Sequence, residues 1–109
     1  MALAENCYRL TRAFPKAEMF GLTSQIRRAA ASVPANIADG HGRESTQTFV
    51  QYLRISQGPL KELETHLLLA GRIGLLDEPA LAVPIEQCQT IGKMIRGLIR
   101  SLQQREGGA

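Results

Sequence analysis

The chain has 109 residues, which is the size of one domain with a modest hydrophobic core. Its 13 lysine and arginine residues exceed its 10 aspartate and glutamate residues, and the net charge of +3 permits nucleic-acid binding without demanding it. Because the chain has no tryptophan, two tyrosines and three phenylalanines, stacking on bases has little support, and any contact with nucleic acid is expected to be electrostatic.

The first predicted helix covers about residues 2–14, where apolar side chains recur every three or four positions. Pro15 ends it, because the residue before a proline is disfavoured in helical conformation. The apolar positions are Leu3, Cys7, Leu10 and Phe14. The two cysteines, Cys7 and Cys88, both fall on apolar stripes and are predicted to be buried, reduced thiols, since a disulfide requires an oxidising compartment.

The second predicted helix runs from about Leu22 to His41, with Thr23 or Ser24 as its cap. Pro34 lies in its interior, where a proline costs about 3 kcal/mol and leaves the carbonyl of residue 30 without its partner. We therefore expect a kink at Pro34. Ser32 or Asn36 is a candidate for satisfying the freed backbone groups, and Asn36 lies where its amide can bridge to a neighbouring helix.

Two longer helices complete the pattern, over about residues 45–73 and 80–103, with a break at Gly74 and at residues 77–79. The last three residues are expected to fray. The inner stripe of the third helix is Phe49, Leu53, Ser56, Leu60, Leu63, Leu67 and Ala70. The inner stripe of the fourth is Leu81, Ile85, Cys88, Gly92, Ile95, Ile99 and Leu102.

These elements predict one all-α domain over residues 1–109, an antiparallel up-and-down four-helix bundle with its second helix kinked at Pro34. The first helix is much shorter than its partners, so part of their apolar surface needs another cover. Several apolar residues also point away from the inner stripes, which indicates a second contact surface and a homo-oligomer, although scattered surface apolar residues are the alternative. The candidate interface residues are Ile55, Leu69, Ile73, Ile91, Met94 and Leu98.

Cationic side chains recur at helical spacing and form candidate stripes for phosphate contacts. An ordinary solvated face is the alternative interpretation. No acidic residue occurs between Lys93 and Arg105. The candidate nucleic-acid-binding residues are Arg27, Arg28, Arg54, Lys61, Lys93, Arg96 and Arg100.

Other classes of function have weaker support in the sequence. The chain has only two histidines, and the pair formed by Glu62 and His66 is far from a di-iron ligand set, so we expect no metal or cofactor. No nucleophile elbow or phosphate loop indicates an enzyme. The start of the chain lacks signal-peptide character and no apolar run has membrane-spanning length, so we expect a cytoplasmic protein without a membrane partner.

The stretches RRAA at residues 27–30 and SVPANIADG at residues 32–40 resemble the motif of one bacterial family. Its members are small four-helix bundle proteins encoded by intervening sequences in large-subunit ribosomal RNA genes, and the accessory proteins of diversity-generating retroelements are related to them. The resemblance covers about residues 10–76. Further matches are LT at 10–11, FP at 14–15, LT at 22–23, QI at 25–26, Gly58 with Leu60, ELE at 62–64 and GLL at 74–76.

This resemblance implies a bundle that assembles into a ring, typically of five subunits. In the retroelement branch the ring is basic, binds nucleic acid and partners a reverse transcriptase. The family pattern begins further upstream with an aromatic-containing first helix, has serine where this chain has Pro59, and often has glutamate in place of Asp39. Pro59 is expected to add a kink to the third helix. The resemblance also marks Pro34, Asn36, Asp39 and Gly40 as a structural motif.

The leading hypothesis is therefore a non-catalytic, ring-forming basic scaffold. Its expected partners are other copies of itself, RNA or DNA bound without sequence specificity, and a nucleic-acid enzyme such as a reverse transcriptase. The alternative is a structural or protein-interaction module with no role in nucleic-acid binding.

Overall fold

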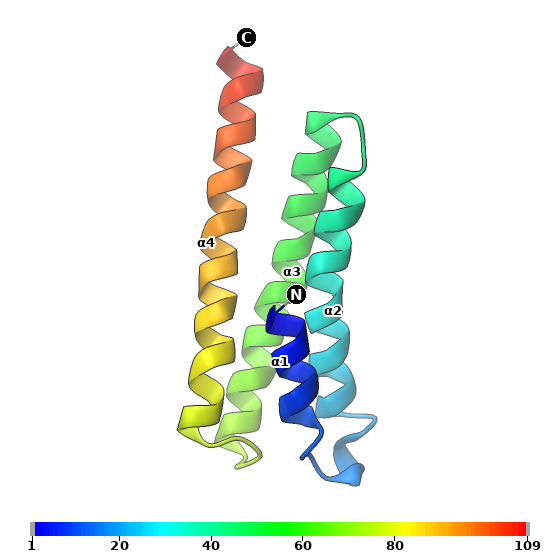
Figure 1. The fold of residues 1–109 in the computed structure, drawn as a ribbon, viewed down its shortest axis with the longest axis vertical. Helices are drawn as coiled ribbons and strands as arrows, with labels where there is room; N and C mark the ends of the chain where they lie inside the picture. The colour runs from blue at the N-terminus through cyan, green and yellow to red at the C-terminus, as the bar shows by residue number, and fades with distance from the viewer. Residues whose placement is uncertain (1, 109) are drawn as a thin grey trace.

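The computed structural model describes residues 2–108, with side chains described through Arg105, and within them every regular element is helical (Figure 1). The bundle measures 53 × 23 × 18 Å. The helices are α1 (Ala2–Thr11), α2 (Leu22–His41), α3 (Thr46–Arg72) and α4 (Glu78–Gly108), with a short 3₁₀ turn, η1 (Lys16–Glu18), between α1 and α2. The predicted four-helix bundle is confirmed.

The helices pack in chain order around the bundle: α2 contacts α3, α3 contacts α4, and α1 lies between α2 and α4. Over the described residues the backbones of α2 and α4 do not approach each other closely, and α1 lies between them over part of their length. However, α1 has only 10 residues, whereas α4 has 31. Helix α1 therefore begins part of the way along the bundle, and beyond Ala2 none of the described helices lies between α2 and α4 (Figure 1).

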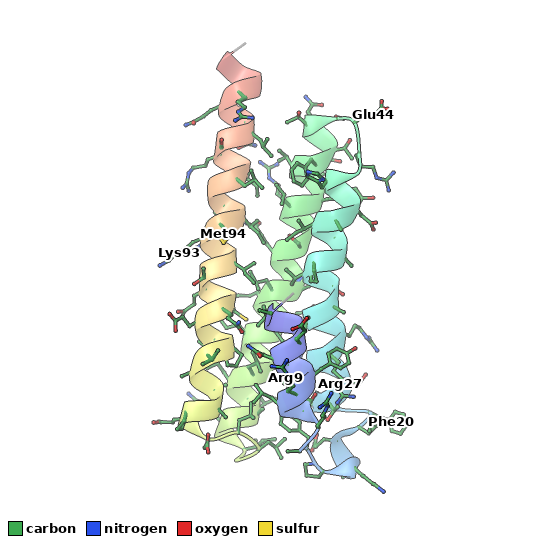
Figure 2. The ribbon with its side chains drawn as sticks, viewed as in Figure 1. Arg9, Phe20, Arg27, Glu44, Lys93 and Met94 are labelled. Carbon is green, nitrogen blue, oxygen red and sulfur yellow. The ribbon has the colours of Figure 1, made fainter. Side chains whose placement is uncertain are left out.

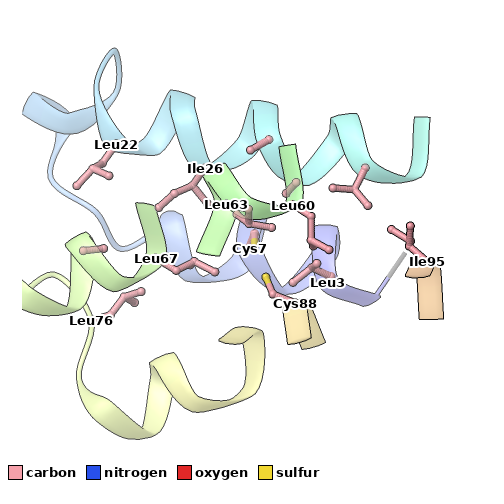
Figure 3. Packing of buried hydrophobic residues seen from close by; sticks show 14 of the residues in the cluster. Leu3, Cys7, Leu22, Ile26, Leu60, Leu63, Leu67, Leu76, Cys88 and Ile95 are labelled. Atoms are coloured by element: carbon pink, nitrogen blue, oxygen red, sulfur yellow. The ribbon is translucent and has the colours of Figure 1, made fainter. Parts of the chain in front are cut away.

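The core follows the predicted stripes closely. Ile26, Leu63, Leu67 and Cys7 have no exposed surface, and they meet beside Cys88 where all four helices contribute (Figure 3). The polar Ser56 on the α3 stripe is also fully buried, and its hydroxyl donates to the carbonyl of Leu53 over 2.6 Å. Burial of such apolar side chains makes the largest favourable contribution to the packing of the helices.

The helix ends show how the chain reverses direction. Ser45 caps α3 by accepting from the Thr48 amide at 3.3 Å, and Asp77 accepts from the Ala80 amide at 2.9 Å at the start of α4. The end of α3 forms a Schellman motif, in which Gly74 adopts φ = 85° and the Leu75 amide donates to the Ala70 carbonyl over 2.9 Å. Gly74 suits this place because the left-handed conformation is unfavourable for other residues.

Four details of the sequence interpretation are wrong. Helix α1 ends at Thr11 rather than near residue 14, because the next amides, of Arg12 and Phe14, donate to carbonyls three residues back and close turns instead of continuing the helix. Neither Thr23 nor Ser24 caps α2, since its N-cap is Gly21 with no side-chain bond. The buried hydroxyl of Thr23 has no hydrogen-bond partner among the described residues.

The third correction concerns Asn36, whose amide does not bridge to a neighbouring helix. It donates to the carbonyl of Ser32 in its own helix over 2.8 Å, one turn back. Helix α2 runs continuously through Pro34, and the kink stays a prediction. The fourth concerns α4, which begins at Glu78 and continues through Gly108, five residues beyond the predicted end, whereas fraying of the tail stays a prediction.

Gly40, the last residue of the SVPANIADG stretch, has a packing role. It is buried where α2 meets α3, and a Cβ at this position would overlap the Cβ of Tyr52 and crowd the ring of Phe49. The neighbouring His41 packs edge-on against Phe49, with 5.6 Å between ring centroids. A glycine here lets the two helices approach closely at the end of the bundle where α1 is absent, whereas Asp39 is exposed.

Candidate nucleic-acid interface

A polar cleft of about 750 Å³ lies along the line where α3 and α4 meet. Each helix contributes three polar side chains at positions i, i+4 and i+7, which brings them to one face. From α3 they are Gln57, Lys61 and Glu64, and from α4 they are Gln89, Lys93 and Arg96. Leu60, Cys88 and Gly92 complete the lining. We call this the basic cleft.

Three cations and one carboxylate line the basic cleft, so its formal charge is +2. Lys61 Nζ lies 3.4 Å from Glu64 Oε1, and the Lys61 side chain is 80% exposed. An ion pair in water at this distance is weak, which leaves Lys61 free to exchange its partner. Lys93 and Arg96 are exposed and form no ion pair within the described residues.

Gly92 is the buried floor residue beneath the Arg96 guanidinium. A Cβ at this position would lie 3.2 Å from Arg96 Nη1 and 3.6 Å from a methyl group of Leu60. The absence of a side chain at Gly92 thus lets Arg96 lie close to the backbone of its own helix. The cationic groups form the walls of the cleft, and small or apolar groups form its floor.

The cationic surface continues along the same two helices. Arg54 is seven residues before Lys61 and lines a second, smaller hollow together with Gln103 of α4. Arg100 follows Arg96 by one helical turn, and both are exposed. The structure thus assembles five of the seven predicted cations on the α3–α4 side of the bundle. We call this set the basic seam; it comprises Arg54, Lys61, Lys93, Arg96 and Arg100.

The other two predicted cations lie on α2, outside the pair of helices that carries the basic seam. Arg27 is half-buried and joins α1 to α2: its Nε donates to Thr11 Oγ1 over 2.9 Å, and its guanidinium lies 4.8 Å from the centroid of the Tyr8 ring (Figure 2). These contacts give Arg27 a structural role that the sequence interpretation missed. Arg28 is exposed on the same helix.

Sequence reasoning also missed the two glutamines of the basic cleft. Gln57 precedes Lys61 by four residues and Gln89 precedes Lys93 by four. This shared spacing places each glutamine on the same helical face as its lysine and could have identified both from the sequence. Their amide groups supply hydrogen-bond donors without charge, which suits the oxygens of a phosphate.

The two cysteine thiols near the centre of the bundle are expected to be unreactive at neutral pH. Cys7 and Cys88 are both free and buried, as predicted. Burial raises the pKa of Cys7 to about 11 and, with smaller contributions from Cys7 and Glu64, raises the pKa of Cys88 to about 12. A thiol with so high a pKa stays protonated at neutral pH and is a poor nucleophile or metal ligand.

Nothing in the described part of the chain gathers three or more histidine, cysteine, aspartate or glutamate side chains in a way that would hold a metal ion. None of the helices described for residues 2–108 has the length and apolar character needed to cross a membrane.

The candidate interface residues for self-association are mostly exposed. Met94 is 66% exposed, Ile55 and Ile73 are each 54% exposed, and Leu69 and Leu98 are 45% and 40% exposed. Ile91 is half-buried and packs against the core. Five of the six positions are therefore exposed, whereas Ile91 belongs to the core surface, and their role in self-association stays a prediction.

Comparison with curated proteins finds no match. Among solved structures, the chain is similar to the crystal structure of a protein of unknown function from the S23 ribosomal protein family of Bacteroides thetaiotaomicron. The TM-score is 0.77 with 23% sequence identity, over 88% of this chain and 87% of the other, and this likeness supports the fold. The model of the 23S rRNA-intervening sequence protein family matches residues 1–97. The chain therefore belongs to the 23S rRNA-intervening sequence protein family.

Proposed function

We propose that this protein is a non-catalytic, homo-oligomeric scaffold that binds RNA or DNA without sequence specificity through its basic seam. The observation that carries the proposal is the convergence of Lys61, Lys93 and Arg96, from two helices, in one cleft of net positive charge. Arg54 and Arg100 extend the same surface along the bundle. A row of cations along a rigid helix pair suits the repeating charges of a nucleic-acid backbone.

The lining of the cleft favours contact with phosphates rather than bases. None of its lining side chains is aromatic, so it has no surface on which bases stack. The arginine and lysine heads, and the amides of Gln57 and Gln89, are the donor types that proteins present to phosphate oxygens. Contacts of this kind position a nucleic acid without reading its sequence.

The test is the salt dependence of binding to a generic RNA or DNA duplex. Each phosphate contact contributes about 0.9 to the slope of log K against log salt concentration for duplex DNA. Replacing Lys93, Arg96 and Arg100 together with glutamine is expected to lower that slope by about 2 to 3 and to weaken binding at low salt. Filter retention or fluorescence anisotropy over a range of salt concentrations measures both.

A matched control removes the same charge elsewhere. Arg9, Arg12 and Lys16 are exposed near the opposite end of the chain, and their joint replacement by glutamine is expected to leave the slope nearly unchanged. If both triple variants lose binding equally, the basic seam is not the site. If neither variant nor the wild type binds nucleic acid, the proposal is wrong.

A second candidate, a structural or protein-interaction module, has its own support in an apolar groove between α2 and α4. The two candidate functions differ in their partners. The basic seam would bind a nucleic acid or a nucleic-acid enzyme such as a reverse transcriptase, whereas the groove would bind a protein surface. Self-association, with five subunits as the family resemblance implies, is common to both. Light scattering coupled to size exclusion, with and without nucleic acid, separates them.

A further inference from the structure

Glu64 is an unexpected member of the basic cleft, because a carboxylate repels the phosphates that the surrounding cations attract. Among the described residues that line the cleft it is the only acidic one. The other glutamate of α3, Glu62, lies outside the cleft lining. Phosphate binding therefore leaves the role of Glu64 unexplained, and its surroundings show what kind of group it can bind.

The Glu64 carboxylate is more buried than the lysine that neutralises it. Its side chain is 22% exposed, against 80% for Lys61, and Lys61 Nζ donates to Glu64 Oε1 over 3.4 Å. This is the only hydrogen bond of the carboxylate within the described residues. When Lys61 turns to a phosphate, the half-buried carboxylate loses this donor, and an acceptor left unpaired in such a place costs free energy. The ligand itself then has to supply a donor for Glu64.

Glu64 marks one end of the basic seam. Helices α3 and α4 run antiparallel (Figure 1), and Leu60 lies level with Gly92, where an added Cβ would be 3.6 Å from a Leu60 methyl group. Residues that follow Leu60 in α3 therefore lie beside residues that precede Gly92 in α4, which places Glu64 near Cys88. In agreement, burial raises the pKa of the Cys88 thiol to about 12, and the charges of Cys7 and Glu64 add to this. All five cations of the seam lie on the same side of Glu64, toward the C-terminal end of α4.

A nucleic-acid strand that follows the seam brings a sugar to this end. Lys61 and Glu64 are three residues apart, about 4.5 Å along the helix axis. Since each phosphate of the strand is joined to a sugar on both sides, a phosphate at Lys61 places a sugar beside Glu64. The ribose of RNA carries a 2′-hydroxyl, which donates and accepts hydrogen bonds, and the deoxyribose of DNA does not.

The bases are a less suitable source of the donor. Their amino groups differ from one base to the next, whereas every ribose carries the 2′-hydroxyl. The described lining of the cleft also has no aromatic side chain on which a base stacks. The 2′-hydroxyl is thus the donor that suits a site that binds without sequence specificity.

We propose that the basic cleft binds RNA in preference to DNA, with the Glu64 carboxylate accepting a hydrogen bond from a ribose 2′-hydroxyl. This inference rests on the proposed function, because it names the class of nucleic acid that the same site binds. With RNA, the carboxylate exchanges the Lys61 donor for a hydroxyl donor, while Lys61 binds the adjoining phosphate. With DNA, the carboxylate repels the same phosphate and gains no donor in return, so RNA binds more tightly.

Three single-stranded probes of equal length separate the loss of the donor from a change in the shape of the sugar. Oligouridylate, its 2′-fluoro analogue and oligodeoxyuridylate carry the same base and differ only at the 2′ position. The fluorine atom keeps the RNA-like sugar conformation but cannot donate a hydrogen bond. Measured by fluorescence anisotropy at low salt, the wild-type protein is expected to bind oligouridylate at least about fivefold more tightly than either analogue, which corresponds to one net hydrogen bond.

Two substitutions of Glu64 remove the same charge but differ in the acceptor that remains. Glu64→Met leaves no strong acceptor, so the ratio of the affinities for oligouridylate and its 2′-fluoro analogue is expected to fall to about one, whereas Glu64→Gln keeps a neutral acceptor and retains part of the ratio. Both raise the formal charge of the cleft from +2 to +3 and are expected to strengthen binding of oligodeoxyuridylate. Glu62→Gln is the matched control: it removes a charge at an exposed position outside the cleft and is expected to keep the wild-type ratio.

Three results overturn the proposal. If the wild-type protein binds oligouridylate and its 2′-fluoro analogue equally, no hydroxyl donates at the site, and salt-dependent binding through the basic seam then stands without it. A wild-type preference that persists in Glu64→Met means that the hydroxyl is bound elsewhere. If the wild-type protein binds none of the three probes at low salt, the proposed function is wrong together with this inference.

Discussion

The two halves of this bundle have the same three long helices but different interiors. In the closed half, α1 lies between α2 and α4, and Cys7, Ile26 and Leu63 form a core without exposed surface. In the open half, beyond the start of α1, the same inner stripes continue but line the apolar groove between α2 and α4. The difference shows that three helices with good apolar stripes still leave apolar surface uncovered, and that the short α1 covers only the part of the bundle in which the closed core lies.

The largest expected effect tests the closed half. Leu63→Ala removes a fully buried side chain beside Cys7 and is expected to lower the free energy of unfolding by about 2–5 kcal/mol. Met94→Ala in the open half is expected to change it by less than about 0.5 kcal/mol, since its side chain is 66% exposed. Urea unfolding of both variants at the same low protein concentration measures these changes. Equal losses would contradict the division into two halves.

Gly40 lies in the open half, where α2 packs against α3 and leaves no room for a Cβ. Gly40→Ala is expected to destabilise the fold by about 1–3 kcal/mol, because the added methyl group overlaps Tyr52 and forces α2 away from α3. Gly97→Ala is the matched control: an added Cβ there meets only Arg100 Nη2, at 4.0 Å, and alanine is expected to stabilise the helix by about 0.5–1 kcal/mol. Thermal unfolding of the two variants gives the sign directly. If Gly40→Ala left the stability unchanged, α2 and α3 would be able to move apart without loss of free energy.

Arg27 tests how firmly α1 is attached to α2. Arg27→Gln removes the hydrogen bond to Thr11 and the contact with the Tyr8 ring, and it is expected to cost about 1 kcal/mol. Its effect should be concentrated in α1, so hydrogen exchange of the α1 amides is expected to accelerate more than that of α3. Arg28→Gln, at an exposed neighbouring position, is the control and is expected to be neutral. A uniform acceleration in both helices would contradict a local clamp.

The smallest expected effect on the free energy of unfolding comes from the two thiols, and it appears only at alkaline pH. Burial raises the pKa of Cys7 to about 11 and that of Cys88 to about 12, above the ordinary value of 9.0, so the folded state holds these protons more tightly than the unfolded state. The corresponding stability is fully present below pH 9 and is lost as pH rises toward 11 and 12. Unfolding measured between about pH 7 and 11 is expected to show the decline, and the Cys7→Ala/Cys88→Ala variant is expected to show less of it.

Much of the fold could be read from the sequence because helical periodicity is a local property. The α3 stripe from Leu53 to Ala70 is buried as predicted, and Gly74 ends the helix where its left-handed conformation is needed. The caps were less predictable. Gly21 rather than Thr23 or Ser24 precedes α2, because η1 orders the approach of the chain through backbone bonds. Asn36 bonds within its own helix because the Ser32 carbonyl is one turn away.

The candidate site divides in the same way. Sequence spacing identified the cations of the basic seam, since residues three and four apart share a helical face. Their convergence depends on how α3 and α4 are rotated against each other, which no single helix specifies. Arg27 shows the limit of this reasoning. Its charge suits a phosphate contact, but in the folded protein its guanidinium contacts Thr11 and the ring of Tyr8.

The sequence by itself determined the helices, their inner faces, the family and the presence of excess apolar and cationic surface, because each of these follows from residue type and local spacing. Only the tertiary structure decided which surfaces meet. It placed Lys61 and Lys93 in one cleft, brought apolar residues of α2 and α4 to one groove, and set Phe20 at the end of the bundle where α2 begins. The physical reason is that contacts between distant residues depend on the relative positions and rotations of whole helices, which are set by packing around the shared core.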